Sequence, residues 1–295
     1  MTAPLPRVAW IGLGVMGSPM AENLLRAGYP VTGYTLEQHK LDRLAEHGGT
    51  PARSVAEAAR HADVVVTMLP ADADVESVAH GPAGILANAR PGALLIDMST
   101  VAPRTATALA AAGAGHGLRV LDAPVSGGES GAVEGSLSVM AGGPPEVFAA
   151  ARPLFEVLGG TVVHCGPNGA GQTVKAANQL IVAAGLQACA EAVVLLERSG
   201  VDLDAALDVL NGGLAGSAVL TRKRHNFLGR DFTPGFRIDL HHKDMGIVTD
   251  AAREAGVALP LGALMARLVA EARDRGDGGL DHSALLRGVE RTAAP

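Results

Sequence analysis

The stretch Val8-Ala9-Trp10-Ile11-Gly12-Leu13-Gly14-Val15-Met16-Gly17 decides the fold. Four apolar residues with the character of a buried strand lead directly into a G-x-G-x-x-G loop, and a helical pattern through Met20, Leu24 and Leu25 ends at Gly28. Strand, glycine loop and helix in this order are the context of the dinucleotide-binding fingerprint. The glycines allow a tight turn, close approach of a pyrophosphate and close packing of helix on strand. This loop is therefore predicted to bind NAD(P).

The end of the next strand, Val31-Thr32-Gly33-Tyr34, bears on the choice of cofactor. An acidic residue here binds the ribose 2′-hydroxyl of NAD, whereas a nearby Arg accommodates the 2′-phosphate of NADP. The chain has Thr35, which lacks the carboxylate that would repel a phosphate, and His39 or Lys40 could supply positive charge. Glu37 could equally reach a ribose. The preference stays open, with a slight lean to NADP.

Strand and helix patterns alternate through the first half of the chain. The predicted strands are 62–69, 93–99, 118–122 and 161–164, and the predicted helices start at Ser54 and cover 105–112 and 145–158. This alternation predicts a Rossmann-type α/β domain with a doubly wound parallel sheet. Ligands bind at the carboxyl ends of such strands. Candidate cofactor contacts are therefore Met68, Leu69, Pro70 and Thr100, although each could be an ordinary strand end.

A turn of small residues follows the strand that ends at Asp122. Ser126-Gly127-Gly128 could direct successive backbone N–H groups toward an anion such as a carboxylate. An ordinary glycine turn is the alternative interpretation.

The second half of the chain changes character after Gly166. Helical patterns dominate, at 170–199, 204–210, 244–255, 262–275 and 281–290. We therefore predict two domains, an NAD(P)-binding domain at 1–166 and an all-α C-terminal domain at 167–295, joined by the long helix at about 170–199. This boundary would put the start of the long helix beside an interdomain crevice, where ligand sites concentrate.

The start of the long helix, Gly169-Ala170-Gly171-Gln172-Thr173-Val174-Lys175-Ala176-Ala177-Asn178, carries the candidate catalytic residue. Of 24 basic residues only four are lysine. Lys175 and Asn178 share a helix face, and the positive end of the helix dipole disfavours the charged form of a nearby lysine. Such a lysine suits proton transfer. A lysine that merely extends from a buried helix to solvent is the alternative.

Composition excludes several other classes of protein. A net charge of −6 argues against a nucleic-acid or anionic-membrane surface. Cys165 and Cys189 are the only cysteines, so no disulfide framework or thiolate metal site is expected. The adjacent His241 and His242 point about 100° apart on a helix, so we expect no metal site and interpret both as helix-surface or pocket residues. With no signal-peptide pattern before the first strand, and with Gln187 and Glu191 interrupting the apolar helix, a soluble cytoplasmic protein is expected.

Taken together, these motifs resemble the β-hydroxyacid dehydrogenase family, which includes 3-hydroxyisobutyrate dehydrogenases and tartronate semialdehyde reductases. The resemblance covers nearly the whole chain. It rests on the glycine loop 12–17, on 122–128, on 169–178 and on Lys243-Asp244. Within the family, the chain is most similar to the tartronate semialdehyde reductase subgroup, through 212–217, 234–241 and 281–285. It departs from that subgroup at Thr35-Leu36, where an acidic residue followed by Arg is usual.

The resemblance implies a Rossmann domain followed by a helical domain that forms homo-oligomers, dimers or tetramers. It implies that Lys175 protonates a carbonyl oxygen as hydride arrives, and that Ser126, Gly127 and Gly128 hold a substrate carboxylate. Asn178 would orient substrate or lysine, and Thr100 and Lys243 would line the nicotinamide. The cofactor set is completed by Gly12, Leu13, Gly14, Val15, Met16, Gly17, Thr35, Met68, Leu69 and Pro70.

The expected reaction is the reduction of tartronate semialdehyde to glycerate. The alternative within this class is a related enzyme of the family. It would be a 3-hydroxyisobutyrate dehydrogenase or a reductase of glyoxylate or succinic semialdehyde. An NAD(P)-sensing module without turnover is the alternative from another class. It would keep Gly12, Gly14 and Gly17 but would need neither Lys175 nor Asn178. Phe236, Arg237 and Asp239 receive no individual role.

Overall fold

The computed structural model describes residues 4–292. The chain divides into two compact units, Met1–Lys175 (unit 1) and Ala176–Pro295 (unit 2). This division falls inside the long helix α9 (Ala170–Arg198), whereas the boundary predicted from the sequence, between 166 and 167, stays a prediction. The two units are described separately.

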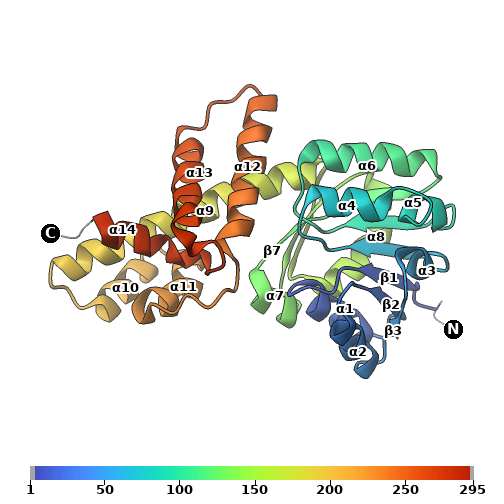
Figure 1. The fold of residues 1–295 in the computed structure, drawn as a ribbon, viewed down its shortest axis with the longest axis horizontal. Coiled ribbons are helices and arrows are strands. Elements are labelled where there is room, and N and C mark those ends of the chain that lie inside the picture. Colours follow the sequence, from blue (N-terminus) through green and yellow to red (C-terminus); the bar gives the residue numbers. More distant parts are fainter. Residues whose placement is uncertain (1–3, 293–295) are drawn as a thin grey trace. The chain divides into compact units, whose positions relative to one another are not determined.

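In unit 1, strands and helices alternate from β1 to β9 (Figure 1). The strands are β1 (Val8–Ile11), β2 (Val31–Tyr34), β3 (Thr50–Pro51), β4 (Val64–Thr67), β5 (Leu94–Asp97), β6 (Arg119–Asp122), β7 (Val125–Ser126), β8 (Ser138–Gly142) and β9 (Thr161–Gly166). The helices are α1 (Gly17–Arg26), α2 (Gln38–Glu46), α3 (Val55–Ala59), α4 (Asp72–Ala79), α5 (Ile85–Asn88), α6 (Pro103–Gly115), α7 (Gly128–Glu134) and α8 (Pro145–Leu158).

The strands described in unit 1 form one sheet in the order β3-β2-β1-β4-β5-β6-β8-β7, with β9 paired to β8. The strands from β3 to β6 are all parallel. The prediction of a doubly wound, Rossmann-type sheet is therefore confirmed. The sheet is not parallel throughout, because β8 runs antiparallel to both β6 and β7. A short connection through β7 and α7 reverses the chain here, where a parallel strand would need a full crossover.

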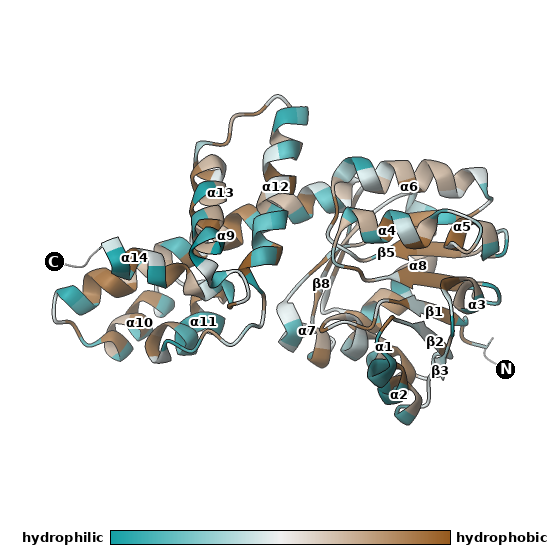
Figure 2. Cartoon of the chain, viewed as in Figure 1, coloured by the Kyte–Doolittle hydropathy of each residue, from teal (hydrophilic) through white to brown (hydrophobic). Residues whose placement is uncertain are grey.

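Two hydrophobic cores cover the two faces of this sheet. In β1, Val8 and Trp10 pack into one core, while Ala9 and Ile11 pack into the other. Helices α1 and α8 contribute to the first core, and α3, α4, α5 and α6 to the second. Because both faces are covered, the central strands are apolar throughout, as the brown strands in Figure 2 show.

The elements described in unit 2 are helical, as predicted. They are α10 (Leu203–Gly212), α11 (Ala218–Gly229), α12 (Ile238–Glu254), α13 (Pro260–Ala272), a π-helical turn (Arg273–Asp277), a 3₁₀ helix (His282–Leu285) and α14 (Leu286–Thr292). Sequence analysis missed α11 and started α12 six residues late, because polar residues dominate both stretches. The predicted helix 262–275 is α-helical only as far as Ala272, after which the chain forms the π-helical turn, in which Gly276 adopts φ +89°.

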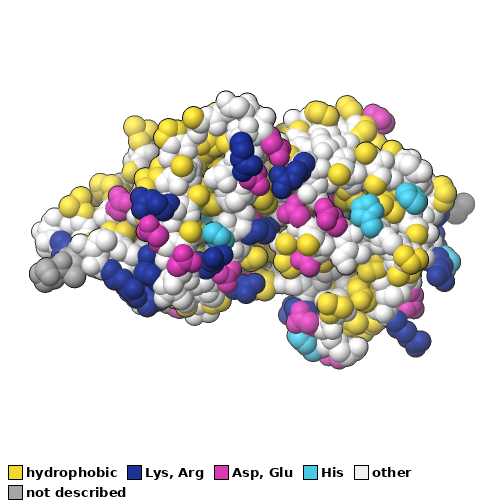
Figure 3. All heavy atoms as spheres, turned by 45° about the horizontal axis from the view of Figure 1, so that its top comes forward, with side chains coloured by type: hydrophobic (Ala, Val, Ile, Leu, Met, Phe, Trp, Pro, Cys, Tyr) yellow, Lys and Arg dark blue, Asp and Glu magenta, His cyan; other side chains and the backbone are white. Residues whose placement is uncertain are grey.

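Helix α9 is long and apolar enough to cross a membrane by length and composition alone, and one third of its most apolar window is buried. The central helix of a folded domain meets the same criterion. Its buried residues include Ala183, Leu186, Ala190 and Val193, which belong to the core of unit 2. On the face shown in Figure 3, acidic and basic side chains are interspersed without a large region of one sign.

Candidate active site

Four neighbouring strands of unit 1, β1, β4, β5 and β6, end at the same level of the sheet. Ile11 lies opposite Thr67, Thr67 lies opposite Asp97, and Asp97 lies opposite Asp122. Since these strands are parallel, the loops that follow them share one edge of the sheet. The strand order reverses between β1 and β4, which makes this edge the ligand-binding side of an open α/β sheet.

The loop after β1 has the shape that a bound pyrophosphate requires. Gly12 has φ +101°, and a side chain there would collide with the carbonyl oxygen of Met68. A side chain at Gly17 would collide with the Gly12 carbonyl, so α1 packs tightly against the loop. A Cβ added at Gly14 would meet no atom within 4 Å, so this part of the loop is open. The residues present therefore fit an NAD(P) pyrophosphate at the start of α1.

The other predicted cofactor residues of this edge differ in exposure. Leu13 is buried in the core, so only its backbone can face a ligand, whereas Val15 is exposed. Met68 and Leu69 are partly buried after β4 and Pro70 is exposed. Met16, Thr35 and Thr100 are partly exposed. Thr35 directly follows β2, and Thr100 lies three residues after the end of β5.

The segment after β2 contains both acidic and basic side chains. Lys40 forms an ion pair with Glu37, and the His39 ring lies 3.8 Å from the same carboxylate. The hydrogen bond from Lys40 lowers the pKa of Glu37. Thr35 adds no charge of its own, so the segment after β2 is close to neutral.

Asp97 is a fully buried acid at the end of β5. Its Oδ1 accepts hydrogen bonds from the Thr67 hydroxyl at 2.8 Å and from the Ser99 backbone N–H at 3.1 Å. Burial raises the pKa of Asp97 to about 6 in spite of these hydrogen bonds. The Ser99 hydroxyl in turn accepts from the Leu69 N–H at 2.9 Å. Asp97 thus connects the end of β5 to the loop after β4.

Asp122, at the end of β6, caps the helix that carries Lys175. Its two carboxylate oxygens accept from the backbone N–H of Gly169 at 2.7 Å and of Gln172 at 3.1 Å. A Cβ at Gly171 would lie 2.8 Å from the same carboxylate, so the first turn of α9 needs glycine to close around it. Burial raises the pKa of Asp122, which the N–H groups oppose. An acid therefore faces the positive end of the α9 dipole.

Lys175 is buried, with only 6% of its surface exposed. Its Nζ donates to the carbonyl oxygen of Val125 at 2.8 Å. Val125 precedes Ser126 in β7, so the ammonium lies next to the predicted anion turn. The lysine does not extend to solvent, which removes the alternative interpretation from sequence.

The turn Ser126-Gly127-Gly128 has a backbone conformation that favours glycine at two positions. Gly127 has φ +140° and Gly128 has φ +65°, and a Cβ at Gly128 would meet no atom within 4 Å. Successive residues in such conformations turn their N–H groups into a concavity suited to an anion. Ser126 is fixed by antiparallel pairing with Ser138.

In unit 2, the predicted site residues Asn178 and Lys243 are connected through two hydrogen bonds and an ion pair. Asn178 Nδ2 donates to Gln179 Oε1 at 2.8 Å, and Gln179 Nε2 donates to Asp244 Oδ2 at 2.5 Å. Lys243 Nζ lies 3.2 Å from the other oxygen of Asp244. Gln179 and Asp244 are both buried. This arrangement sets the orientation of the Asn178 amide.

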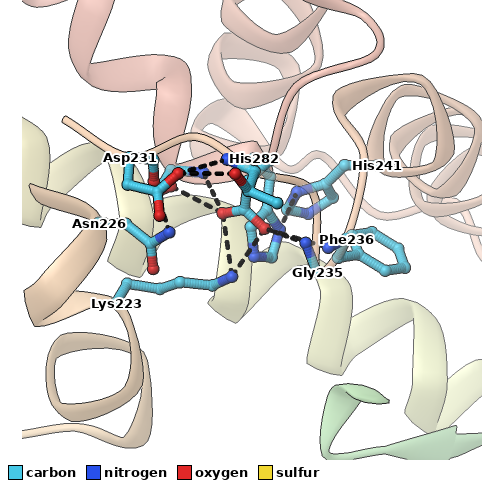
Figure 4. Close-up of polar contacts among 10 residues, drawn as sticks. Lys223, Asn226, Asp231, Gly235, Phe236, His241 and His282 are labelled. Atoms are coloured by element: carbon cyan, nitrogen blue, oxygen red, sulfur yellow. Dashed lines mark hydrogen bonds and ion pairs between the residues drawn. The ribbon is translucent and has the colours of Figure 1, made fainter. Parts of the chain in front are cut away.

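A second polar cluster in unit 2 is centred on the fully buried Asp281 (Figure 4). Its carboxylate accepts from Lys223 Nζ at 2.8 and 2.9 Å and from the N–H groups of Gly235 and Phe236, both at 3.0 Å. Burial disfavours its ionisation, but the neighbouring His282 and Lys223 outweigh this and lower the pKa of Asp281.

The histidine rings of this cluster correct an expectation from sequence. His241 is completely buried rather than on the helix surface, and its Nδ1 lies 3.2 Å from His282 Nδ1. Both rings pack against Phe236, with centroids 5.8 and 5.2 Å away. His241 therefore belongs to the interior packing of unit 2. No group of three potential metal ligands occurs within residues 4–292.

Sequence reasoning missed the polar residues that hold this site together. Asp97, Asp122, Gln172 and Gln179 were not predicted to have a role. The signal was present for the two acids, since each follows apolar residues of a predicted strand, Asp97 after Leu95-Ile96 and Asp122 after Val120-Leu121. The two glutamines lie at helical spacing on either side of Lys175 in an otherwise apolar helix.

Known protein families match both parts of the chain. A profile described as the NAD-binding domain of 6-phosphogluconate dehydrogenase matches residues 7–166. One described as the NAD-binding domain of NADP-dependent 3-hydroxyisobutyrate dehydrogenase matches residues 169–289. The 2-hydroxy-3-oxopropionate reductase of Escherichia coli is 37% identical over 287 residues, which cover 97% of this chain and 98% of the relative.

The chain belongs to the β-hydroxyacid dehydrogenase family. Another relative in the family, the NAD-dependent L-serine dehydrogenase of Pseudomonas aeruginosa, is 39% identical over 267 residues, covering 88% of this chain and 90% of the relative. A solved structure of the Mycobacterium tuberculosis 3-hydroxyisobutyrate dehydrogenase with L-serine superimposes with a TM-score of 0.86 at 36% identity, covering 97% and 99% of the two chains. This β-hydroxyacid dehydrogenase is an NAD(P)-dependent oxidoreductase that acts on a small hydroxy acid.

Proposed function

We propose that the protein reduces tartronate semialdehyde (2-hydroxy-3-oxopropanoate) to glycerate. The observation that carries this proposal is the buried Lys175, whose Nζ lies 2.8 Å from the Val125 carbonyl directly before Ser126-Gly127-Gly128. A proton donor beside an anion turn suits a short substrate with a carboxylate at one end and an aldehyde near it. Bound NAD(P)H supplies the hydride.

Lys175 gives its proton to the carbonyl oxygen as the aldehyde carbon receives the hydride, so the products are a primary alcohol and NAD(P)⁺. The Val125 carbonyl holds the ammonium in place before the transfer. General acid catalysis of this kind contributes about 10²–10⁴-fold in rate. Ser126, Gly127 and Gly128 hold the substrate carboxylate, and Asn178, whose amide Gln179 orients, contacts the substrate or the lysine.

The cofactor contacts are proposed along the carboxyl edge of the sheet. The segment Gly12–Gly17 holds the pyrophosphate, with Leu13 acting through its backbone. Met68, Leu69 and Pro70 follow the path from adenosine to ribose, and Thr35 lies at the ribose. Thr100 and Lys243 line the nicotinamide. The neutral environment at Thr35, with Lys40 nearby in sequence, favours NADP slightly over NAD.

Other reactions of the family are the alternatives within this class. They are the oxidation of 3-hydroxyisobutyrate, the reduction of glyoxylate or succinic semialdehyde, and the oxidation of L-serine that one relative's name describes. The substrates differ beyond the carboxylate, where one methylene in an apolar pocket changes specificity by about 1–3 kcal/mol. The full-length similarity to a 2-hydroxy-3-oxopropionate reductase supports tartronate semialdehyde. A sensor without turnover would not need the buried Lys175.

The protein is further proposed to act in the cytoplasm as a homo-oligomer, a dimer or tetramer, assembled through its helical part. Exposed apolar residues on α9, Ile181 and Leu195, support an interface between copies of the chain. No nucleic acid or membrane partner is proposed.

A substrate panel tests this function. Initial rates are measured for tartronate semialdehyde, methylmalonate semialdehyde, succinic semialdehyde and glyoxylate, and in reverse for L-serine, each with both cofactors. The proposal predicts the highest kcat/KM for tartronate semialdehyde. A higher value for another substrate would replace the assignment, and cofactor binding without turnover of any substrate would favour the sensor.

A further inference from the structure

Gln172 is a completely buried amide in the first turn of α9, with 1% of its surface exposed. Its Nε2 donates to the Ser99 carbonyl at 2.8 Å, and its Oε1 accepts from the Val101 N–H at 3.2 Å. The two hydrogen bonds are therefore made to the residues directly before and after Thr100. The side chain thus donates one hydrogen bond to the backbone of the loop after β5 and accepts one from it, as the backbone of an adjacent β-strand does.

We propose that Gln172 is a positioning residue that holds the Thr100 segment in register with Lys175. This proposal rests on the proposed function, in which Thr100 lines the nicotinamide and Lys175 donates the proton. Gln172 touches neither substrate nor reacting atoms in it. It acts through the backbone at Ser99 and Val101.

The backbone of the same residue is tied to a second strand end. The Gln172 N–H donates to Asp122 Oδ2 at 3.1 Å, so one residue connects the ends of β5 and β6 to the start of α9. Lys175 lies three positions later, on the same helical face. Any shift of the Thr100 segment against α9 therefore changes the geometry between the cofactor loop and the proton donor.

The Gln172 amide satisfies both backbone groups because it carries a donor and an acceptor at its end. Ser99 and Val101 are both fully buried, so the Ser99 carbonyl and the Val101 N–H have no access to bulk water. Methionine fills the same volume but neither donates nor accepts at these positions. Glutamate has the same shape, and its protonated form can accept from Val101 and donate to Ser99. Ionised glutamate cannot donate and would face the Ser99 carbonyl with a negative charge.

This difference gives a readout that a merely structural role would not produce. In the Gln172→Glu variant, the protonated acid restores both hydrogen bonds, whereas the carboxylate breaks one. Turnover of Gln172→Glu relative to wild type should therefore fall as pH rises through the titration of the new acid. If Gln172 only stabilises the fold, the ratio stays constant over the pH range in which the variant remains folded.

The experiment uses the full-length protein and three variants, Gln172→Met, Gln172→Glu and, as a matched control, Gln187→Met. Gln187 lies on the same helix, and its amide bonds only the side chain of Glu191 in the hydrogen bonds described, at 2.8 Å. NADH and NADPH affinity is measured by fluorescence titration. Turnover is measured with the best panel substrate, using cofactor with hydrogen or deuterium at the transferred position.

We expect Gln172→Met to reduce kcat about 10–100-fold, as misplacement by a fraction of an ångström does. Its deuterium isotope effect on kcat should rise, because hydride transfer becomes more limiting, and cofactor affinity should fall several-fold. Gln187→Met should behave as wild type. Unchanged kcat, isotope effect and cofactor affinity in folded Gln172→Met would overturn the proposal.

Two further outcomes are informative. If Gln172→Met does not fold, the pH dependence of Gln172→Glu decides, and a constant ratio to wild type overturns the positioning role. If wild type turns over no panel substrate, the proposed function fails by itself. The positioning role of Gln172 is then tested by cofactor affinity alone. Equal affinity in wild type and the Gln172 variants overturns that role.

Discussion

Two buried aspartates, Asp122 in unit 1 and Asp281 in unit 2, have carboxylates that are stabilised by different groups. Each is almost inaccessible to solvent, and each accepts hydrogen bonds from two or more backbone N–H groups. Asp281 also has the ammonium of Lys223 at 2.8 Å. Asp122 instead faces the N–H groups of Gly169 and Gln172 at the start of a helix.

The surroundings shift the pKa values of the two acids in opposite directions. Burial raises the pKa of Asp122, whereas neighbouring positive groups outweigh burial and lower the pKa of Asp281. Asp281 joins the loop at Gly235, the helix at Lys223 and the 3₁₀ helix at Ser283, so its main effect is on stability. Asp122 fixes the helix that carries Lys175, so its main effect is on the site. The same residue type is a scaffold in one unit and a positioning group in the other.

Replacing Asp281 should produce the largest change in stability. Asp281→Ala leaves the Lys223 ammonium and the N–H groups of Gly235, Phe236 and Ser283 without their acceptor, which we expect to cost about 3–5 kcal/mol in the free energy of unfolding. Urea denaturation measures this. Asp231→Ala is the control, because Asp231 is exposed and its carboxylate contacts only Thr233 and, at 3.8 Å, the exposed His225 ring among the contacts described. A loss below about 1 kcal/mol for Asp281→Ala would remove the distinction drawn here.

Asp122→Asn should cost less stability and more activity. An asparagine can accept at only one of its two terminal atoms, so one N–H of α9 would face an NH₂ group. The expected cost is about 1–2 kcal/mol, with a loss of kcat at full folding. Asp202→Asn is the matched control, since Asp202 caps α10 with one exposed bond to the Ala205 N–H at 3.1 Å. Full turnover in Asp122→Asn would refute the positioning role.

Asp97→Asn tests the effect of burial without a countercharge. The folded pKa of about 6 lies above the ordinary value of 3.8. The folded state therefore binds more protons between these values, and wild-type stability falls as pH rises through this window. Removing the acid should make the variant gain about 1 kcal/mol relative to wild type between pH 5 and 7.5. Parallel stability curves for the two proteins would contradict this.

Local patterns in the sequence were sufficient to predict the sheet of unit 1. The glycine loop after β1 and the apolar strands ending at Thr67, Asp97 and Asp122 define it, because each strand is covered on both faces and therefore reads as a continuous apolar run. The antiparallel β8 was not predicted, since pairing direction depends on where the chain returns.

The lysine of the site was predictable, but its supports were not. Lys175 stands out because lysine is rare in the chain and follows a glycine-rich helix start. Gln172 and Asp122 bond backbone groups about 50 to 70 residues away in the sequence. The sequence shows them as polar residues beside apolar ones, but it does not identify their distant partners. The Asp281 cluster was missed for the same reason. His241 was interpreted as a helix-surface or pocket residue because its ring partner in the interior, His282, is 41 residues away.

The central claim is that Lys175 donates the proton, and Lys175→Ala tests it most directly. Turnover of tartronate semialdehyde and binding of NAD(P)H are measured for wild type, Lys175→Ala and Lys175→Arg. The account predicts that Lys175→Ala loses about 10²–10⁴-fold in kcat while its affinity for cofactor and its unfolding midpoint stay near wild type. Lys175→Arg should be similarly inactive, because Arg does not give up its proton. Near-normal turnover in Lys175→Ala would contradict the account.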